Sequence, residues 1–155
     1  MELTGNLQIV CPIRGQLKVN KRIWGVDNSP NAVQVAVLNM LLNGDGKTNI
    51  IKDDSLENIK KYAEKYDVIT CNPPFGTKIV EKRSMVLRQY DLGFEWYIDE
   101  AGVLKKTDTL LSQQETGILF VEVCVKECKP SGRIAIILPN GYTNASAHAK
   151  YPPLF

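Results

Sequence analysis

The sequence CNPPFG, residues 71–76, places an amide, two prolines and an aromatic ring in consecutive positions. An exocyclic amine on a planar base is a poor nucleophile because its lone pair is delocalised into the ring. The side-chain carbonyl of Asn72 and the main-chain carbonyl of Pro73 could accept hydrogen bonds from the two N–H groups of the amine and orient it toward an electrophile. Pro74 removes a competing donor, and Phe75 offers a face for an unstacked base. The pattern predicts a clamp for a planar amine, and the alternative is a simple turn.

Two further polar positions stand at equivalent places in the chain. Asp27 ends the short apolar segment RIWGVD, and Asp54 with Ser55 follows the segment NIIK. One carboxylate can accept hydrogen bonds from both hydroxyls of a ribose, so Asp27 is a candidate cofactor ligand, although an acid here also suits a helix start. Ligands of α/β sheets bind at the carboxyl ends of strands, so we expect these residues and Asn72 to share one rim.

The elements that would position these residues alternate between strands and helices. Strands are expected at residues 22–27, 49–52, 67–71 and 133–138. Helices are expected at 31–43, 56–65 and 112–129. Ser29 and Pro30 suit the start of the first helix, and Ser112 with Glu115 forms a capping box for the last. This order predicts an open, mostly parallel α/β sheet whose last strand is covered on both faces.

Residues 78–111 lack a clean period and are interpreted as an insertion. Basic and aromatic side chains in it could contact the phosphates and bases of a DNA strand, and a solvated charged face beside an aromatic cluster is the alternative. These side chains are Lys78, Lys82, Arg83, Arg88, Tyr90, Phe94, Trp96 and Tyr97.

Composition sets broad limits on the class of protein. The chain has 155 residues, a length typical of one domain, and a net charge of +2, which neither requires nor excludes a nucleic-acid partner. No run approaches the ~20 apolar residues of a membrane span and no signal peptide is apparent, so a cytoplasmic protein is expected. Cys124 and Cys128 are expected on one helix face as buried apolar residues. Without a C-x-x-C pair, no metal site is expected.

The segments described so far together resemble a known group, the amino-group DNA methyltransferases with an (N/D/S)PP(Y/F/W) motif. Among these they are most similar to the methylation subunits of type I restriction-modification systems. The likeness covers most of residues 22–142. One short motif would be weak evidence for the family, whereas four motifs in the family's order are specific evidence. The four blocks are IWGVDNSPNAVQVAVLNMLLNGDG, IIKDDSLE, YDVITCNPPFG and SQQETGILFVEVCVKECKPSGRIAIILPNG.

The resemblance implies a fold and an activity. The fold is a single partial catalytic domain over residues 1–155, with a Rossmann-like sheet, helices on both faces, both ends incomplete and an atypical tail at 144–155. The activity is site-specific, adenine-specific DNA methylation, with transfer of a methyl group from S-adenosylmethionine to N6 of adenine. DNA is the implied partner, specificity and restriction subunits are candidate partners, self-association is left open, and no membrane partner is expected.

The resemblance also assigns roles to residues by their match to the family's motifs. Asp27 would match the acid on the cofactor ribose, and Asp54 the acid near the cofactor's adenine. The implied catalytic positions are Asn72, Pro73, Pro74 and Phe75. The implied cofactor-binding positions are Asp27, Asn28, Asp54, Ser55 and Asn72.

The first family motif, a glycine-rich loop after an Asp-Pro, has its best match in residues 9–17, with Cys11 in place of the acid and Gly15 as the one glycine. This departure motivates a second hypothesis, a catalytically inactive truncated relative that acts as a binding module. A third hypothesis is methylation of RNA or of a protein glutamine, because those substrates also present a planar nitrogen to an Asn-Pro-Pro-aromatic motif.

Overall fold

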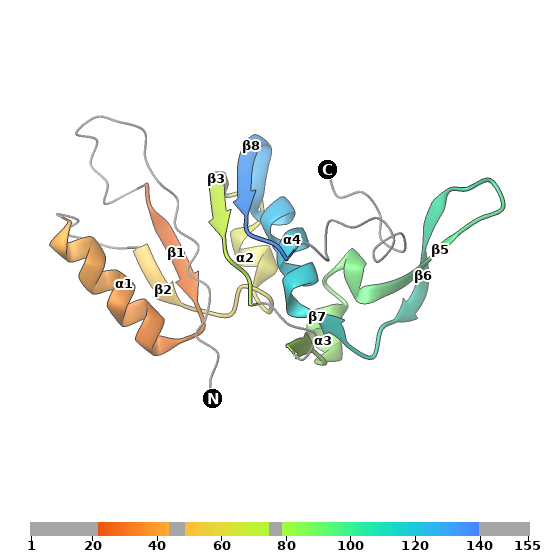
Figure 1. The fold of residues 1–155 in the computed structure, drawn as a ribbon, viewed down its shortest axis with the longest axis horizontal. Helices are drawn as coiled ribbons and strands as arrows, with labels where there is room; N and C mark the ends of the chain where they lie inside the picture. The colour runs from red at the N-terminus through yellow and green to blue at the C-terminus, as the bar shows by residue number, and fades with distance from the viewer. Residues whose placement is uncertain (1–21, 44–48, 75–78, 140–155) are drawn as a thin grey trace.

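The computed structural model describes residues 22–43, 49–74 and 79–139, which form a mixed α/β structure (Figure 1). Its strands are β1 (Trp24–Asp27), β2 (Asn49–Lys52), β3 (Tyr66–Cys71), β4 (Val80–Glu81), β5 (Phe94–Ile98), β6 (Leu104–Leu110), β7 (Gln114–Glu115) and β8 (Cys128–Ile136). Its helices are α1 (Pro30–Leu42), α2 (Ile59–Tyr62), α3 (Ser84–Leu87) and α4 (Thr116–Glu127), with a 3-10 turn η2 (Asp91–Gly93).

The strands predicted to carry the site form two parallel pairs. β1 pairs with β2, and β3 pairs with β8, with Ile69 opposite Ile134. The arrowheads of β1, β3 and β8 point the same way in Figure 1. Side chains bridge the two pairs, since Trp24 and Tyr66 lie with ring centroids 6.5 Å apart. Within the described ranges the pairs stay separate two-stranded sheets, so the parallel pairing is observed but a single open sheet is not.

The start of α1 follows the prediction. Ser29 is the N-cap, its Oγ accepts a hydrogen bond from the backbone N–H of Ala32, and Pro30 takes the first helical position. α1 contacts β1 and β2, but several of its apolar side chains are exposed in the described structure. Ala36 is its buried residue, and Val35, Leu38 and Leu42 are 69%, 58% and 78% exposed.

Two helix predictions were wrong in their bounds. The helix expected at 56–65 is the single turn α2, because Glu64 takes a positive φ of 49° that an α-helix cannot contain. The expected capping box is also not a helix start. Gln114 and Glu115 form β7 and pair with β4, and Glu115 precedes the helix without a side-chain cap bond. Strand pairing therefore wins over local capping at this position.

The end of α4 also differs from the prediction. The helix ends at Glu127 rather than near Lys129, and Cys128 begins β8, so Cys124 and Cys128 do not share a helix face. Both cysteines are nevertheless buried, as expected for small apolar side chains. β8 was expected to be covered on both faces, but Arg133 and Ala135 are exposed in the described structure, while Ile134 packs against the core.

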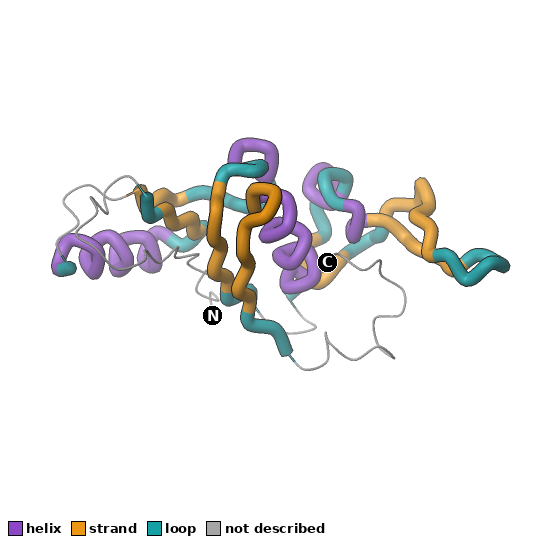
Figure 2. Tube along the Cα trace, turned by 90° about the horizontal axis from the view of Figure 1, so that it is seen from above, coloured by secondary structure: helices purple, strands orange, loops and turns teal. Residues whose placement is uncertain are grey.

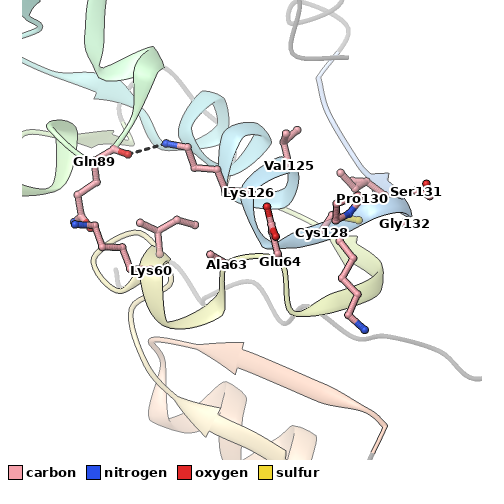
Figure 3. Close-up of a pocket in the computed structure, with 13 residues that line it drawn as sticks. Lys60, Ala63, Glu64, Gln89, Val125, Lys126, Cys128, Pro130, Ser131 and Gly132 are labelled. Atoms are coloured by element: carbon pink, nitrogen blue, oxygen red, sulfur yellow. Dashed lines mark hydrogen bonds between the residues drawn. The ribbon is translucent and has the colours of Figure 1, made fainter.

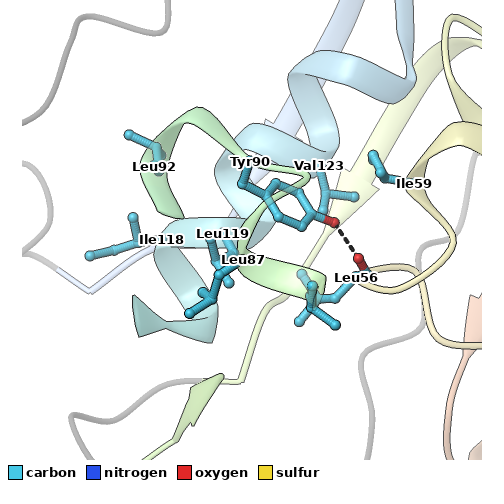
Figure 4. Packing of buried hydrophobic residues seen from close by; sticks show 9 residues of the cluster. Leu56, Ile59, Leu87, Tyr90, Leu92, Ile118, Leu119 and Val123 are labelled. Atoms are coloured by element: carbon cyan, nitrogen blue, oxygen red, sulfur yellow. Dashed lines mark hydrogen bonds between the residues drawn. The ribbon is translucent and has the colours of Figure 1, made fainter. Parts of the chain in front are cut away.

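The segment predicted as an insertion supplies part of the main core (Figure 4). Val86, Leu87, Tyr90 and Leu92 are each no more than 1% exposed, and they pack with apolar residues of α4. These partners include Ile118, Leu119 and Val123. Tyr90 also donates a buried hydrogen bond of 2.7 Å to the carbonyl of Leu56, which fastens this segment to the loop after β2.

The antiparallel hairpin of β5 and β6 projects away from the rest of the structure in both views (Figures 1 and 2). Exposed apolar side chains lie toward its tip, where Ile98 is 58% and Val103 is 53% exposed. None of the helices in the described ranges is both long enough and apolar enough to cross a membrane.

Candidate functional site

The carboxyl ends of β1 and β2 meet Pro74, which follows β3, at one small cavity, but Asn72, which was expected at the same rim, is not among its lining residues. Asp27, Asn28, Asp54, Ser55 and Pro74 all line it. Its volume is about 190 Å³. Typical ligand pockets hold about 300–1,000 Å³, so this cavity accommodates part of a nucleotide-sized ligand. The parallel pairing thus gathers residues that lie far apart in the sequence.

Asp27 is the most unusual group in this cavity. It is 3% exposed, and its Oδ1 accepts a 2.7 Å hydrogen bond from the backbone N–H of Ser29. Its Oδ2 is buried and has no hydrogen-bond partner among the described residues. Burial raises the pKa of Asp27, and the Ser29 N–H opposes that rise. A buried carboxylate oxygen without a partner carries a desolvation penalty that a ligand's hydroxyl could remove.

Asp54 is engaged through both carboxylate oxygens. Its Oδ1 accepts hydrogen bonds from the backbone N–H groups of Leu56 and Glu57 at 3.0 and 3.2 Å. Its Oδ2 accepts from Arg83 at 2.8 Å. Asp54 therefore shapes the loop after β2, and beside it Ser55 is buried against the cavity.

Asp53, which the sequence did not single out, anchors the same loop from the other side. Its side chain accepts hydrogen bonds from Lys61 at 2.6 Å, Tyr62 at 2.5 Å and Asn58 at 2.8 Å. Burial acts to raise the pKa of Asp53, but these hydrogen bonds outweigh it and hold the pKa at about 2. The carboxylate therefore stays ionised and fastens the loop to α2.

The predicted amine clamp leaves the carboxyl end of β3. Asn72 is exposed, Pro73 is buried, and Pro74 lines the cavity beside Asp27 and Asp54. The carbonyl of Cys71 accepts a 3.0 Å hydrogen bond from the N–H of Ile137, which fixes the start of the clamp to the chain after β8. Phe75 lies outside the described residues, as does the predicted first motif at 9–17.

Several lining residues were not predicted. Ile79, Glu81, Arg83, Thr116 and Phe120 also line the cavity. They come from β4 and the residues that flank it and from α4, and no local spacing in the sequence relates them to Asp27. Sequence analysis singled out Arg83 only as a candidate DNA contact, and the one local sign of a structural role is a glutamate two positions before it.

A larger cavity of about 940 Å³ lies at the other end of the strands, beside the first residues of β8 (Figure 3). Its lining includes Glu64 and Ser131, two residues with positive φ, together with Lys60 and Lys126. None of the predicted site residues lines it, so its size alone does not identify it as the site of chemistry. No group of His, Cys, Asp or Glu side chains within the described ranges could hold a metal ion.

The residues considered for DNA contact differ in their exposure and in their contacts. Tyr90 is buried in the core, and Arg83 is bound to carboxylates. Trp96 donates its Nε1–H to the carbonyl of Asp91, and Tyr97 is 50% exposed on the hairpin. Lys82 and Arg88 are exposed, Phe94 is half-buried, and Lys78 lies outside the described residues.

The comparisons with known proteins agree on one family. The family model described as N-6 DNA Methylase matches residues 13–150. The chain is also similar to the type I restriction enzyme EcoEI methylase subunit of Escherichia coli, with 26% identity over 125 residues. That match covers 79% of this chain and 21% of the relative, so the chain spans about a fifth of the relative's length. No solved structure gave a significant match. Because the family model covers most of the chain, including Asp27, Asp54 and Asn72, the protein belongs to the N-6 DNA methylase family.

Proposed function

We propose that the chain is the catalytic core of an S-adenosylmethionine-dependent N6-adenine DNA methyltransferase of a type I restriction-modification system. The carrying observation is that Asp27, whose buried Oδ2 has no hydrogen-bond partner among the described residues, lines the same cavity as Pro74. The acid that we assign to the ribose and the second proline of the motif that we assign to the amine thus line the same cavity. Family membership and the type I relative support DNA as the substrate.

The proposal assigns the two parallel pairs to one open Rossmann-like sheet. β2, β1, β3 and β8 then follow the order of a doubly wound sheet, which would place one further strand between β1 and β3. The contacts between Trp24 and Tyr66, and the shared core of Val26 with Ile69, support this assignment. The site would lie where ligands of such sheets bind, at the carboxyl ends of the strands.

The residues present fit the nucleoside end of the cofactor. Asp27 would accept hydrogen bonds from the ribose hydroxyls through Oδ2, and Asn28 and Ser55 would line that end of the pocket. When bound, S-adenosylmethionine supplies an electrophilic methyl group on its sulfonium sulfur. Asp54 would act by holding its loop, because both of its oxygens already have partners.

The clamp would prepare the acceptor. The side-chain carbonyl of Asn72 and the main-chain carbonyl of Pro73 would each accept a hydrogen bond from one N–H of the adenine amine. These hydrogen bonds would draw the lone pair of the amine nitrogen out of the ring. Phe75 would stack on the flipped base. The exposure of Asn72 is consistent with a group that meets its partner only when substrate arrives.

Two measurements test this function. Calorimetric titration with S-adenosylmethionine is expected to show binding, and labelled methyl transfer to unmethylated duplex DNA is expected to exceed transfer to RNA and to a glutamine-containing peptide. Asn72→Ala should abolish methyl transfer to DNA. Preferred transfer to RNA or peptide would instead support the third hypothesis. No binding and no transfer would support the inactive binding module.

A further inference from the structure

Arg83 connects three carboxylates at the wall of the candidate cofactor cavity. Its Nη2 donates to Asp54 Oδ2 at 2.8 Å and to Glu81 Oε2 at 2.7 Å, and its Nη1 donates to Glu57 Oε2 at 2.9 Å. Its Nε donates to both oxygens of Glu81, at 3.0 and 3.1 Å. The planar guanidinium is suited to this arrangement, because its donors form a rigid fork that a lysine ammonium cannot reproduce.

These carboxylates belong to two parts of the chain that are not adjacent in sequence. Asp54 and Glu57 lie on the loop after β2, which forms the cofactor side of the cavity. Glu81 lies on β4, in the segment that continues from the predicted clamp. Arg83 therefore joins the cofactor loop to the chain that follows Asn72–Pro74.

Each side of this connection is also fixed locally by the same carboxylates. Asp54 Oδ1 accepts the N–H groups of Leu56 and Glu57. Glu81 Oε1 accepts the N–H groups of Lys82 and Arg83 at 2.9 and 2.7 Å. Loss of the guanidinium is therefore expected to weaken the hydrogen bonds of these four backbone N–H groups, and their hydrogen exchange can be measured.

The far end of the β4 segment is held by α4. Thr116 donates its backbone N–H and its Oγ1–H to the carbonyl of Ile79, both at 3.1 Å, and Val80 pairs with Glu115. The segment from Ile79 to Arg83 is thus bonded to α4 at its first residue and to the loop after β2 at its last. Its residues Ile79, Glu81 and Arg83 line the same space as Asp27.

Charge argues against a phosphate-binding role for Arg83. One guanidinium faces three carboxylates, so the local net charge remains negative and a DNA phosphate would be repelled. Burial would raise the pKa of Glu81, but the hydrogen bonds from Arg83 outweigh that effect and hold its pKa below the usual value. Glu81, with a side chain 8% exposed, therefore depends on Arg83 as its counter-ion.

We propose that Arg83 is a positioning residue that assembles the cofactor loop and the segment after the amine clamp into one wall, so that both halves of the site form together. This proposal rests on the proposed function for the identity of the ligand, whereas the contacts of Arg83 are independent of that function. Arg83 would act through Asp54 and Glu81 and would not touch the cofactor. Asp54 would then contribute as the partner of Arg83 rather than as a direct ligand.

The test compares Arg83→Met, Arg83→Lys and the control Arg88→Met. Arg88 is an exposed arginine of the same segment, and its side chain makes no ion pair or hydrogen bond with the residues that the structure describes. Hydrogen exchange followed by mass spectrometry is measured without cofactor on peptides covering residues 54–58 and 80–84. Arg83→Met is expected to accelerate exchange about tenfold or more in both peptides. Arg83→Lys should give an intermediate effect, and Arg88→Met should match the wild type.

Cofactor affinity provides the second readout. If the wild type binds S-adenosylmethionine, Arg83→Met is expected to weaken binding about tenfold and Arg88→Met less than twofold. Faster exchange in residues 80–84 alone, or unchanged affinity in Arg83→Met, would overturn the positioning role. If the wild type binds no cofactor, the proposed function fails, while the exchange of residues 54–58 still decides whether Arg83 joins the two loops.

A milder variant distinguishes the local positioning role of Arg83 from an effect on the overall stability of the fold. Glu57→Gln removes one charge at the most exposed of the three contacts, since the Glu57 side chain is 42% exposed. It should accelerate exchange in residues 54–58 by a smaller factor than Arg83→Met. Unchanged exchange in Glu57→Gln together with global loss of protection in Arg83→Met would mean that Arg83 acts on overall stability, and would overturn the proposal.

Discussion

The backbone N–H of Ser29 donates a 2.7 Å hydrogen bond to Oδ1 of Asp27, a residue that lines the cavity, while Oδ2 of this buried carboxylate has no partner among the described residues. The same Ser29 caps α1, so the start of the helix orients the acid. Two adjacent features of the sequence, an acid and a cap, thus produce one directed acceptor.

Asp27→Asn is expected to weaken S-adenosylmethionine binding about tenfold or more, because an amide cannot accept both ribose hydroxyls as a carboxylate can. Stability should not fall, since burial raises the pKa of Asp27 and the ionised form is therefore penalised in the folded state. Titration calorimetry and urea unfolding measure the two effects. The matched control is Asp67→Asn, at a carboxylate 81% exposed, and equal affinity loss in both variants would contradict the assignment.

Glu127 predicts a dependence of stability on pH. Burial, with a smaller contribution from Cys71, raises its pKa to about 8, and both of its oxygens are buried without a hydrogen-bond partner in the described structure. The folded state therefore holds a proton that the unfolded state releases near pH 4.5. Between these pH values the free energy of unfolding should decrease as pH rises.

Glu127→Gln should make stability less dependent on pH in that interval, because the amide cannot ionise. Urea unfolding of both proteins at about pH 5 and about pH 8 measures the difference, and comparing the changes removes any constant cost of the amide. An equal decrease in the two proteins would show that Glu127 does not hold the proton.

Tyr90→Phe is expected to destabilise the protein by about 1–3 kcal/mol, because it leaves the buried carbonyl of Leu56 without its donor. The Tyr90 hydroxyl joins residues 78–111 to the loop after β2, so the loss should also loosen that loop. Tyr97→Phe is the control, since Tyr97 is 50% exposed on the hairpin. Similar free energies of unfolding for the two variants would argue against a structural role for this hydrogen bond.

The hairpin region is expected not to bind DNA through its lysines. Residues 91–111 contain five acids and two lysines. Lys105 pairs with Asp99 at 2.8 Å, and Lys106 pairs with Asp91 at 2.5 Å. Changing both lysines to Gln should alter DNA affinity less than about twofold and leave its salt dependence unchanged. A decrease of about two in the slope of log affinity against log salt would show that both lysines contact phosphates.

Much of the framework was predictable because it depends on local physics. The strand before Asp27, the cap at Ser29 and the strand before Asn72 follow from apolar runs, a capping side chain and a proline. The gathering of Asp27, Ser55 and Pro74 at one cavity followed from the rule for strand ends. The family likeness added the roles, and the amine clamp and cofactor contacts stay predictions.

What the sequence by itself determined was the identity of the chemical groups and their places at strand ends, because these depend on residue type and on contacts a few positions away. Tertiary structure alone decided how those groups are paired. Glu115 is a strand residue because it pairs with β4. Oδ2 of Asp54 is not available to a ligand because it accepts a hydrogen bond from Arg83, 29 positions away in the sequence. Contacts over such separations depend on the whole packing of the chain, which local spacing does not encode.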